Sequence, residues 1–199
     1  WNKKLGCIEI ETNDAEHRTI IYTSLYHAFV QPSVASDVDG RYRTMSQEIK
    51  QDTAYTNYTV FSLWDTFRAA HPLYTIVSPD MNAAFIRALM RKYAEGGILP
   101  KWELASTETG TMIGYHAVSA IVDAVMKRQV DMEKNQLLEA CIRSSVYDTT
   151  GITPVMDRQV LHNKMMSPAT KYMNEWGYIP CDRVSGSVSQ ALEFAYNDW

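Results

Sequence analysis

The sequence lacks the features that mark several large protein classes. Its three cysteines, Cys7, Cys141 and Cys181, are far apart and form no Cys-x-x-Cys pair, so they indicate neither a zinc site nor a disulfide framework. No run of 18 apolar residues is present to span a bilayer, and residues 1–20 lack the charged start and apolar stretch of a signal peptide. The net charge of -4 offers no basic face for a phosphate backbone, so we expect no nucleic-acid partner.

Several catalytic templates are absent as well. There is no Gly-x-Ser-x-Gly nucleophile elbow, no glycine-rich phosphate loop and no His-Glu-x-x-His zinc helix. Hydrophobic residues make up 46% and charged residues 21% of the 199 residues, which is typical of a folded globular chain. The chain opens on Trp1 without a methionine and closes on Trp199 within an apolar-periodic segment, so we expect a partial domain truncated at both ends.

Apolar residues recur mainly at helical spacing. We find no convincing strand alternation and expect fewer than about a fifth of the residues in strands, with a loop over 33–57 that holds at most a short hairpin. The absence of an internal repeat or linker fits one domain, built as a helical solenoid or an α/α barrel. Segment 112–126 is apolar or small at nearly every position and should be among the most buried. The predicted helices cover residues 14–31, 61–77, 78–95, 112–126, 134–147, 166–175 and 187–199.

The first candidate site lies in the segment from Tyr58 to Arg68. It places the Trp64 indole beside the Asp65 carboxylate, and the Arg68 guanidinium follows three residues later on the same helical face as Asp65. A pyranose needs an aromatic surface for its C–H face and charged groups for its hydroxyls, and this segment supplies both. The alternative is a core tryptophan beside a helical Asp–Arg pair.

Alternating aspartates precede a glycine in the predicted loop. Asp37, Asp39 and Gly40 resemble part of a calcium loop, but an EF-hand register would put Ala35 and Ser46 at the first and twelfth ligand positions. An EF-hand is therefore excluded. A binding loop and a turn stabilised by aspartate side chains both remain open.

A polar loop also leads into the most apolar predicted helix. It carries Lys101, Trp102 and Glu108, and His116 follows at the helix start. Glu108 in front of a buried helix could form the floor of a pocket, or it could be a capping residue near the positive end of the helix dipole. His116 is equally compatible with a hydrogen-bonded core histidine.

Four segments together resemble, in order and spacing, the calcium-dependent exo-α-mannosidases of glycoside hydrolase family 92. The ending from Ser187 to Trp199 also resembles that family, so the likeness covers nearly the whole chain. It implies an all-α fold, with residues 1–199 forming part of an (α/α)6 barrel, and a secreted or periplasmic enzyme. The four segments are residues 36–42, 58–68, 97–102 and 108–116.

The resemblance implies removal of terminal α-linked mannose, from mannosides or N-glycans, with inversion and with a calcium ion. It places Trp64 and Asp65 against the mannose and puts further residues near the pocket, namely Arg68, Asp37, Asp39, Arg41, Lys101, Trp102, Glu108 and His116. The family's acid and base come from later motifs, including an Asn-Asp-Asp run that this chain lacks. We therefore expect the catalytic pair and the calcium ligands outside this chain, and no hydrolysis by the chain alone.

Two further expectations can be tested on a structure. The Asp65 carboxylate should point into a cavity that Glu108 or Asp39 also lines. The rival functions are another α/α-barrel inverting glycosidase that acts on α-glucosides, and a helical solenoid that binds a protein partner through Trp64 and Trp102.

Overall fold

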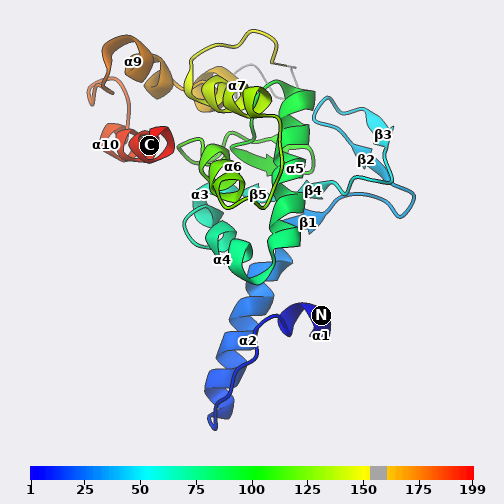
Figure 1. Ribbon diagram of the computed structural model, residues 1–199. Coiled ribbons are helices and arrows are strands. Elements are labelled where there is room, and N and C mark those ends of the chain that lie inside the picture. Colours follow the sequence, from blue (N-terminus) through cyan, green and yellow to red (C-terminus); the bar gives the residue numbers. More distant parts are fainter. Residues whose placement is uncertain (153–160) are drawn as a thin grey trace.

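The computed structural model describes residues 1–152 and 161–199. A helical body carries two projections: a long N-terminal helix with a short helix beside it, and a β-hairpin on one flank (Figure 1). The helices are α1 Asn2–Leu5, α2 Ala15–Val30, α3 Leu63–Thr66, α4 Ala70–Val77, α5 Pro79–Gly96, α6 Ala117–Met126, α7 Lys134–Ser145, the π-helix η1 Leu161–Met165, α9 Pro168–Trp176 and α10 Ser187–Asp198.

The strands are short and form three small antiparallel sheets. In these sheets β1 (Ser33–Val34) pairs with β4 (Tyr58–Thr59), and β2 (Arg41–Arg43) pairs with β3 (Ile49–Gln51). The third sheet has the order β5 (Phe61–Ser62), β6 (Trp102–Leu104), β7 (Thr107–Glu108). The fold is mostly helical, as predicted, and the expected all-α chain is supplemented by these small sheets. Strands of two or three residues are too short to show an alternating pattern in the sequence.

Helix α5 forms the centre of the core. Ser78 and Pro79 begin it as predicted, and Ile86 and Leu89 are completely buried in its middle. Gly97 ends it with φ +80, where a Cβ atom would lie 2.4 Å from the Gly151 carbonyl oxygen. A larger residue at this position would meet both backbone strain and a steric clash. The loop after α5 is thereby held against the turn that contains Gly151.

The predicted helix over 61–77 is interrupted. Its first two residues pair with β6 as strand β5, and Ala69 leaves the helical conformation with φ -140 between α3 and α4. Helix α4 restarts at Ala70, which places Pro72 in its first turn, where a missing N–H costs nothing. The break turns α3 into a short separate helix that ends just before Arg68.

The predicted helix over 112–126 begins later than expected. Met112 and Gly114 have φ angles of +68 and +76, so the chain turns before α6 starts at Ala117. Helix α6 buries Ala120 and Ile121, but Met126 is 78% exposed. Its burial is therefore one-sided. The exposed side faces the groove described below.

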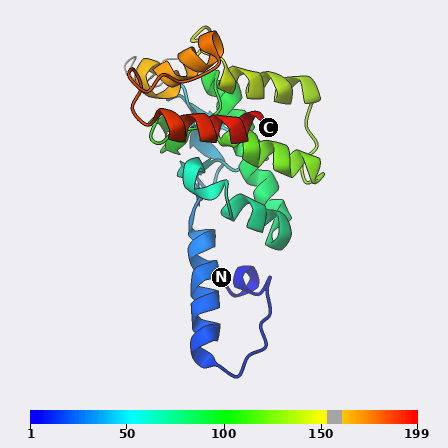
Figure 2. The same cartoon turned by 90° about the vertical axis from the view of Figure 1, so that its left-hand side faces the viewer.

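Other helix predictions are confirmed to within about two residues: α2, α5, α7, α9 and α10. Figure 2 shows α10 lying across the body, and its residue Asn197 contacts Ser119 of α6. Among the described residues, no helix is both long and apolar enough to cross a membrane.

Candidate functional site

Glu193 of α10 lies at the centre of a group of polar side chains from three parts of the chain. The Trp64 indole Nε1 donates a hydrogen bond of 3.1 Å to Oε1 of Glu193, and Arg68 Nη2 lies 2.5 Å from the same oxygen. His116 Nε2 lies 3.2 Å from the other oxygen, Oε2. We call Trp64, Arg68, His116 and Glu193 the Glu193 cluster. It unites three of the predicted site residues around one carboxylate.

Aromatic packing holds the cluster together. The Arg68 guanidinium lies over the Trp64 ring, 5.0 Å from its centroid, and over the Phe67 ring at 4.6 Å. Phe67 in turn stacks on the His116 imidazole, with centroids 3.8 Å apart and planes within 4°. Because α3 ends at Thr66, Phe67 and Arg68 lie directly after it and reach toward α10. The interruption of the predicted helix thus positions the guanidinium.

His116 is a buried, neutral base in this cluster. Burial lowers its pKa to about 4, although the Glu193 carboxylate acts in the opposite direction. Its Nδ1 lies 2.9 Å from the Asn197 side-chain nitrogen. A Cβ atom on Gly114 would lie 2.3 Å from His116 Nε2, so the close packing of this imidazole requires glycine there.

The Glu193 cluster is not sealed from solvent. The Glu193 side chain is 14% exposed and the Arg68 side chain 48% exposed. A ligand hydroxyl could therefore reach the carboxylate and the guanidinium from the open side, while the Trp64 ring supplies apolar surface. A carboxylate that accepts hydrogen bonds beside an indole is an arrangement suited to binding a sugar.

Asp65 is exposed and separate from the cluster's hydrogen bonds. Its carboxylate accepts a hydrogen bond from the Ser62 hydroxyl, one turn earlier in the chain. Neither cavity described in the structure is lined by Asp65, Asp39 or Glu108. The expectation that Asp65 shares a cavity with Glu108 or Asp39 stays a prediction, and Asp65 directly follows Trp64 of the cluster.

Glu108 is buried, and its carboxylate is bound by backbone N–H groups. It is 2% exposed, and its carboxylate accepts hydrogen bonds from the backbone N–H groups of Lys101 (2.8 Å), Trp102 (3.0 Å) and Gly110 (2.7 Å). Burial raises its pKa, and the backbone hydrogen bonds oppose that rise. These contacts tie together the open end of the β6–β7 hairpin, and they leave Glu108 away from the Glu193 cluster's hydrogen bonds.

Lys101 and Trp102 form their hydrogen bonds and strand pairing outside the Glu193 cluster. Lys101 Nζ donates a hydrogen bond of 2.7 Å to the Lys164 carbonyl, and burial lowers its pKa to about 8. Trp102 is half-buried in β6, where it pairs with Ser62 just before α3. Trp102 thereby supports the segment that carries Trp64. Among the described residues no hydrogen bond or ion pair links Lys101 or Trp102 to Glu193.

Asp37 and Asp39 lie on the far side of the body from the cluster. The hairpin β2–β3 and the loop before it project on the flank opposite α3 and α10 (Figure 1). Asp39 accepts a hydrogen bond from the Arg41 backbone N–H at 3.1 Å and forms an ion pair with its side chain at 2.7 Å. Of the two alternatives, a binding loop and a turn stabilised by aspartate side chains, these contacts match the turn. It does not place Asp37 or Asp39 with Trp64.

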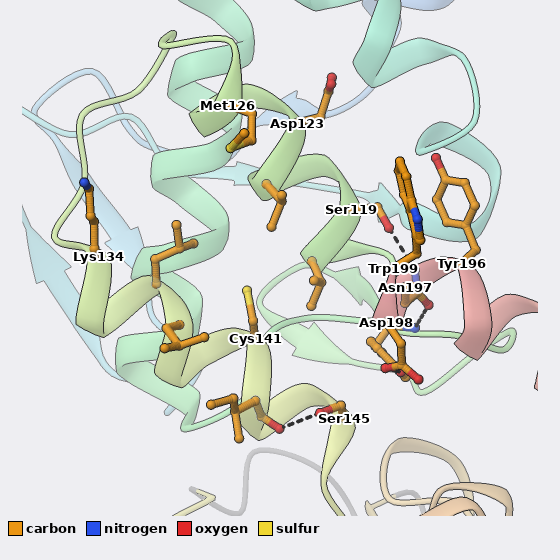
Figure 3. Close-up of a pocket in the computed structure, with 16 residues that line it drawn as sticks. Ser119, Asp123, Met126, Lys134, Cys141, Ser145, Tyr196, Asn197, Asp198 and Trp199 are labelled. Carbon is orange, nitrogen blue, oxygen red and sulfur yellow. Dashed lines mark hydrogen bonds between the residues drawn. The ribbon is translucent and has the colours of Figure 1, made fainter. Parts of the chain in front are cut away.

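A groove of about 570 Å³ lies between α6, α7 and the end of α10 (Figure 3). It is bordered by apolar side chains of α6 and α7, among them Val122, Met126, Leu138 and Ile142, and all four are at least 40% exposed. No residue of the Glu193 cluster lines this groove. Asn197, which contacts His116 of the cluster, is one of its lining residues.

Comparisons with known proteins give the family. All of residues 1–199 match the glycosyl hydrolase family 92 catalytic domain. The chain belongs to glycosyl hydrolase family 92. No curated protein sequence matches it at a significant level.

Solved family 92 structures cover the whole chain. It is similar to the family GH92 α-mannosidase BT3965 from Bacteroides thetaiotaomicron, with 34% identity and a TM-score of 0.84 over 100% of this chain and 25% of that one. The inverting mannosidase BT2199 from the same organism shows 30% identity and a TM-score of 0.83, over 100% of this chain and 26% of that one. The chain thus spans about a quarter of these enzymes, and the resemblance found in the sequence is confirmed.

Glu193 is the site residue that sequence reasoning missed. It lies in the segment from Ser187 to Trp199, which was quoted for the family 92 resemblance without a role for any of its residues. One signal was available: Glu193 is the only charged residue between Ser187 and Asn197, and its immediate neighbours are Leu192 and Phe194. A lone carboxylate in such a helix needs polar partners from elsewhere in the fold.

Proposed function

We propose that this chain is an internal part of the (α/α)6 catalytic barrel of an inverting exo-α-mannosidase, and that the Glu193 cluster forms part of its sugar site. The observation that carries the proposal is the convergence of Trp64, Arg68 and His116 on one partly exposed carboxylate. Family relatives support it: BT2199 is an inverting mannosidase, and BT3965 was solved in complex with mannoimidazole.

The cluster suggests how a terminal mannose would be held. The Trp64 ring would lie against a C–H face of the sugar, and Arg68 would donate to its oxygens. The exposed Asp65 carboxylate, directly after Trp64, would accept hydrogen bonds from hydroxyls at the edge of the same site. Charged acceptors and donors make the strongest hydrogen bonds to a neutral sugar.

Inversion needs one carboxylic acid to protonate the leaving group and one carboxylate to activate water, about 6.5–9.5 Å apart. From sequence we predicted both groups outside this chain. We keep this proposal and assign Glu193 to sugar binding, because it is the carboxylate on which Trp64, Arg68 and His116 converge. Among the described residues no second carboxylate joins the cluster. Both catalytic carboxylates are therefore expected from other parts of the enzyme.

Calcium does not fit the described residues of this chain. A calcium ion takes six to eight oxygen ligands, usually with several carboxylates. In residues 1–152 and 161–199, no three His, Cys, Asp or Glu side chains are grouped in a way that could hold a metal ion. The Asp39 carboxylate is already paired with Arg41. We propose that the calcium expected for this family is bound by other parts of the parent enzyme, and no step is assigned to it here.

The remainder of the parent enzyme is the proposed partner of the groove between α6, α7 and α10. Exposed apolar side chains such as Leu138 and Ile142 are costly in water, and a barrel would cover them with further helices. The substrates proposed for the whole enzyme are α-mannoside oligosaccharides, including those of N-glycans. A secreted or periplasmic location follows from the family resemblance alone.

Hydrolysis of aryl glycosides by the full-length parent enzyme tests the proposal. We expect release of nitrophenol from the aryl α-mannoside, loss of that activity with a chelator, and its recovery with added calcium. The aryl α-glucoside should be hydrolysed far more slowly, because the two sugars differ at the C2 hydroxyl. Preferential α-glucoside hydrolysis would support the rival glycosidase. No hydrolysis of either, in calcium, would favour the binding solenoid. The 199-residue chain alone should hydrolyse neither substrate.

A further inference from the structure

We propose that aromatic rings and an arginine at the end of α9 form a second sugar-binding surface, which holds a part of an oligosaccharide other than the terminal mannose. The activity readout of this inference rests on the proposed function, whereas its binding readout needs no hydrolysis. We call the surface the Trp176 patch, and its residues are Tyr172, Trp176, Tyr178 and Arg183.

The patch begins on the last turn of α9. Tyr172 and Trp176 lie one turn apart on this helix, and their ring centroids are 4.7 Å apart. The chain then turns at Gly177, which has φ +74, and the Tyr178 ring follows at 5.8 Å from the Trp176 ring. The Trp176 indole is thus grouped with two tyrosine rings from the same short segment.

Arg183, in the loop between α9 and α10, adds a positive charge to these rings. Its guanidinium carbon lies 5.1 Å from the Trp176 ring centroid and 5.9 Å from that of Tyr172. The pKa of Arg183 is raised most by Tyr172 and less by Asp182, so both groups lie close to the guanidinium. An arginine stacked on aromatic rings is held in place and can still donate hydrogen bonds in its own plane.

The Trp176 patch is open to solvent in the described part of the chain. Trp176 is 43% exposed and Tyr178 is 56% exposed. A Cβ atom on Gly177, between them, would meet no atom within 4 Å. Figure 1 shows α9 and the loop after it at the edge of the molecule, away from α2 and from the hairpin β2–β3. A ligand can therefore reach both rings without movement of the described helices.

The patch repeats a pair of groups found in the Glu193 cluster. There the Arg68 guanidinium lies 5.0 Å from the Trp64 ring centroid. The corresponding distance in the Trp176 patch is 5.1 Å. An indole offers a flat apolar surface to the C–H face of a sugar, and a guanidinium donates to its oxygens. The same chemistry thus occurs at two accessible places on this chain.

An oligosaccharide is the ligand that this surface fits. The groove between α6, α7 and α10 is bordered by aliphatic side chains such as Leu138 and Ile142, a surface that further helices would cover. The Trp176 patch instead combines rings with hydroxyl groups and a guanidinium. In the proposed function the Glu193 cluster holds only the terminal mannose, so the other sugars of the substrate need a separate surface. Two contacts on one oligosaccharide strengthen its binding by raising the effective concentration.

Trp176→Ala in the full-length parent enzyme tests the patch by activity. For hydrolysis of an α-mannan oligosaccharide, kcat/KM should fall about tenfold, as for the loss of one aromatic anchor. The fall should lie mainly in KM, because the patch binds a part of the substrate that does not react. For an aryl α-mannoside, which offers one sugar only, kcat/KM should not change. Equal falls for both substrates, or no fall for the oligosaccharide, would overturn the inference.

Trp1→Ala is the matched control. Trp1 is also an exposed indole beside a tyrosine ring, with its centroid 4.6 Å from that of Tyr26, but no arginine is recorded over it among the described contacts. Its kinetic constants should equal those of the unchanged enzyme with both substrates. If Trp1→Ala reproduces the result of Trp176→Ala, the effect is not specific to the Trp176 patch and the inference fails.

The ¹⁹F signal of Trp176 tests binding directly in the full-length parent enzyme labelled with fluorotryptophan. The signals of Trp176 and Trp1 are assigned by their loss in Trp176→Phe and Trp1→Ala. We expect the α-mannan oligosaccharide to shift the Trp176 signal and to leave the Trp1 signal in place. An unmoved Trp176 signal would overturn the inference. A lower melting temperature of Trp176→Ala in that case would show that the patch is a protein contact.

The binding readout also separates this inference from the proposed function. Because the ¹⁹F shift needs no turnover, a moved Trp176 signal supports the patch even if the enzyme hydrolyses no aryl glycoside. Absent hydrolysis would then contradict only the proposed function. An enzyme that hydrolyses the aryl α-mannoside but shows no shift of the Trp176 signal would contradict only the second sugar-binding surface.

Discussion

Two glutamates, Glu103 and Glu193, each pair with a cation, but their surroundings differ. The Glu103 side chain is 0% exposed, and its Oε1 lies 3.2 Å from Lys92 Nζ, which is 1% exposed. The same oxygen accepts a hydrogen bond of 2.6 Å from the Ser106 N–H. Glu193 instead pairs with the half-exposed Arg68 and keeps 14% of its own side chain open to solvent.

The difference separates a structural ion pair from a binding site. A ligand cannot reach Glu103 without unfolding the sheet of β5, β6 and β7 around it, and removing one charge leaves the other stranded. Glu193 can exchange a protein contact for a ligand, because its side chain and that of Arg68 are partly open to solvent. We therefore expect changes at Glu193 to affect activity, and changes at Glu103 to affect stability.

Glu193→Gln should have the largest effect on activity. The substitution keeps the size of the side chain but removes the charge that accepts hydrogen bonds from Trp64 and Arg68 and, as proposed, from the sugar. Each hydrogen bond lost to a charged acceptor costs on the order of 1.5–3 kcal/mol. We expect kcat/KM for an aryl α-mannoside to fall by about a hundredfold or more, with an unchanged melting temperature of the parent enzyme. Glu175→Gln, at an exposed position on α9, is the control and should leave both unchanged. Comparable activity of Glu193→Gln and the control would remove Glu193 from the sugar site.

Glu103→Leu should mainly lower stability. It leaves the Lys92 ammonium buried without a partner, which costs on the order of 3–5 kcal/mol. The double variant Lys92→Met with Glu103→Leu removes both charges and should recover most of that loss. Thermal unfolding of the parent enzyme measures both. A melting temperature of Glu103→Leu equal to that of the unchanged enzyme would contradict the comparison between the two glutamates.

Asp65→Ala should have an intermediate effect on activity. Loss of a hydrogen bond between a sugar hydroxyl and a charged acceptor costs on the order of 1.5–3 kcal/mol, or more if it tightens in the transition state. This corresponds to roughly tenfold to several-hundredfold in kcat/KM. Ser62→Ala removes the intramolecular partner of Asp65 but keeps the carboxylate, so its effect should be smaller. Equal effects of the two variants would mean that Asp65 acts only through Ser62.

Asp39→Asn should have the smallest effect. Asp39 pairs with Arg41 on an exposed hairpin, and exposed ion pairs contribute little. We expect kcat/KM within about twofold of the unchanged enzyme. A loss as large as that of Asp65→Ala would show that the hairpin side of the molecule contributes to the sugar site in the complete enzyme.

The sequence was sufficient for the long helices and for part of the site. Regular apolar spacing, with Ser78 and Pro79 as a start signal, predicted α5 to within two residues. Trp64 and Arg68 were singled out because indole and guanidinium side chains suit a sugar. Strand β5, at the start of the predicted helix over 61–77, was missed because it pairs Phe61 with Glu103 and Ser62 with Trp102, which lie far along the sequence.

The rest of the site depends on tertiary contacts. Glu193 gains its importance from Trp64 and Arg68, which lie 129 and 125 residues earlier in the chain. No local pattern around Glu193 could supply that information. Conversely, Glu108 looked like a pocket residue from its place before an apolar helix, but nearby backbone N–H groups occupy its oxygens.

A crystal structure of the full-length parent enzyme with mannoimidazole would test the central claim most directly. We predict that the sugar analogue lies against Trp64, within hydrogen-bond distance of the Glu193 carboxylate, with Asp65 at the edge of the same site. An analogue bound elsewhere in the enzyme, with Trp64 and Glu193 still in contact only with each other and with Arg68 and His116, would contradict the account.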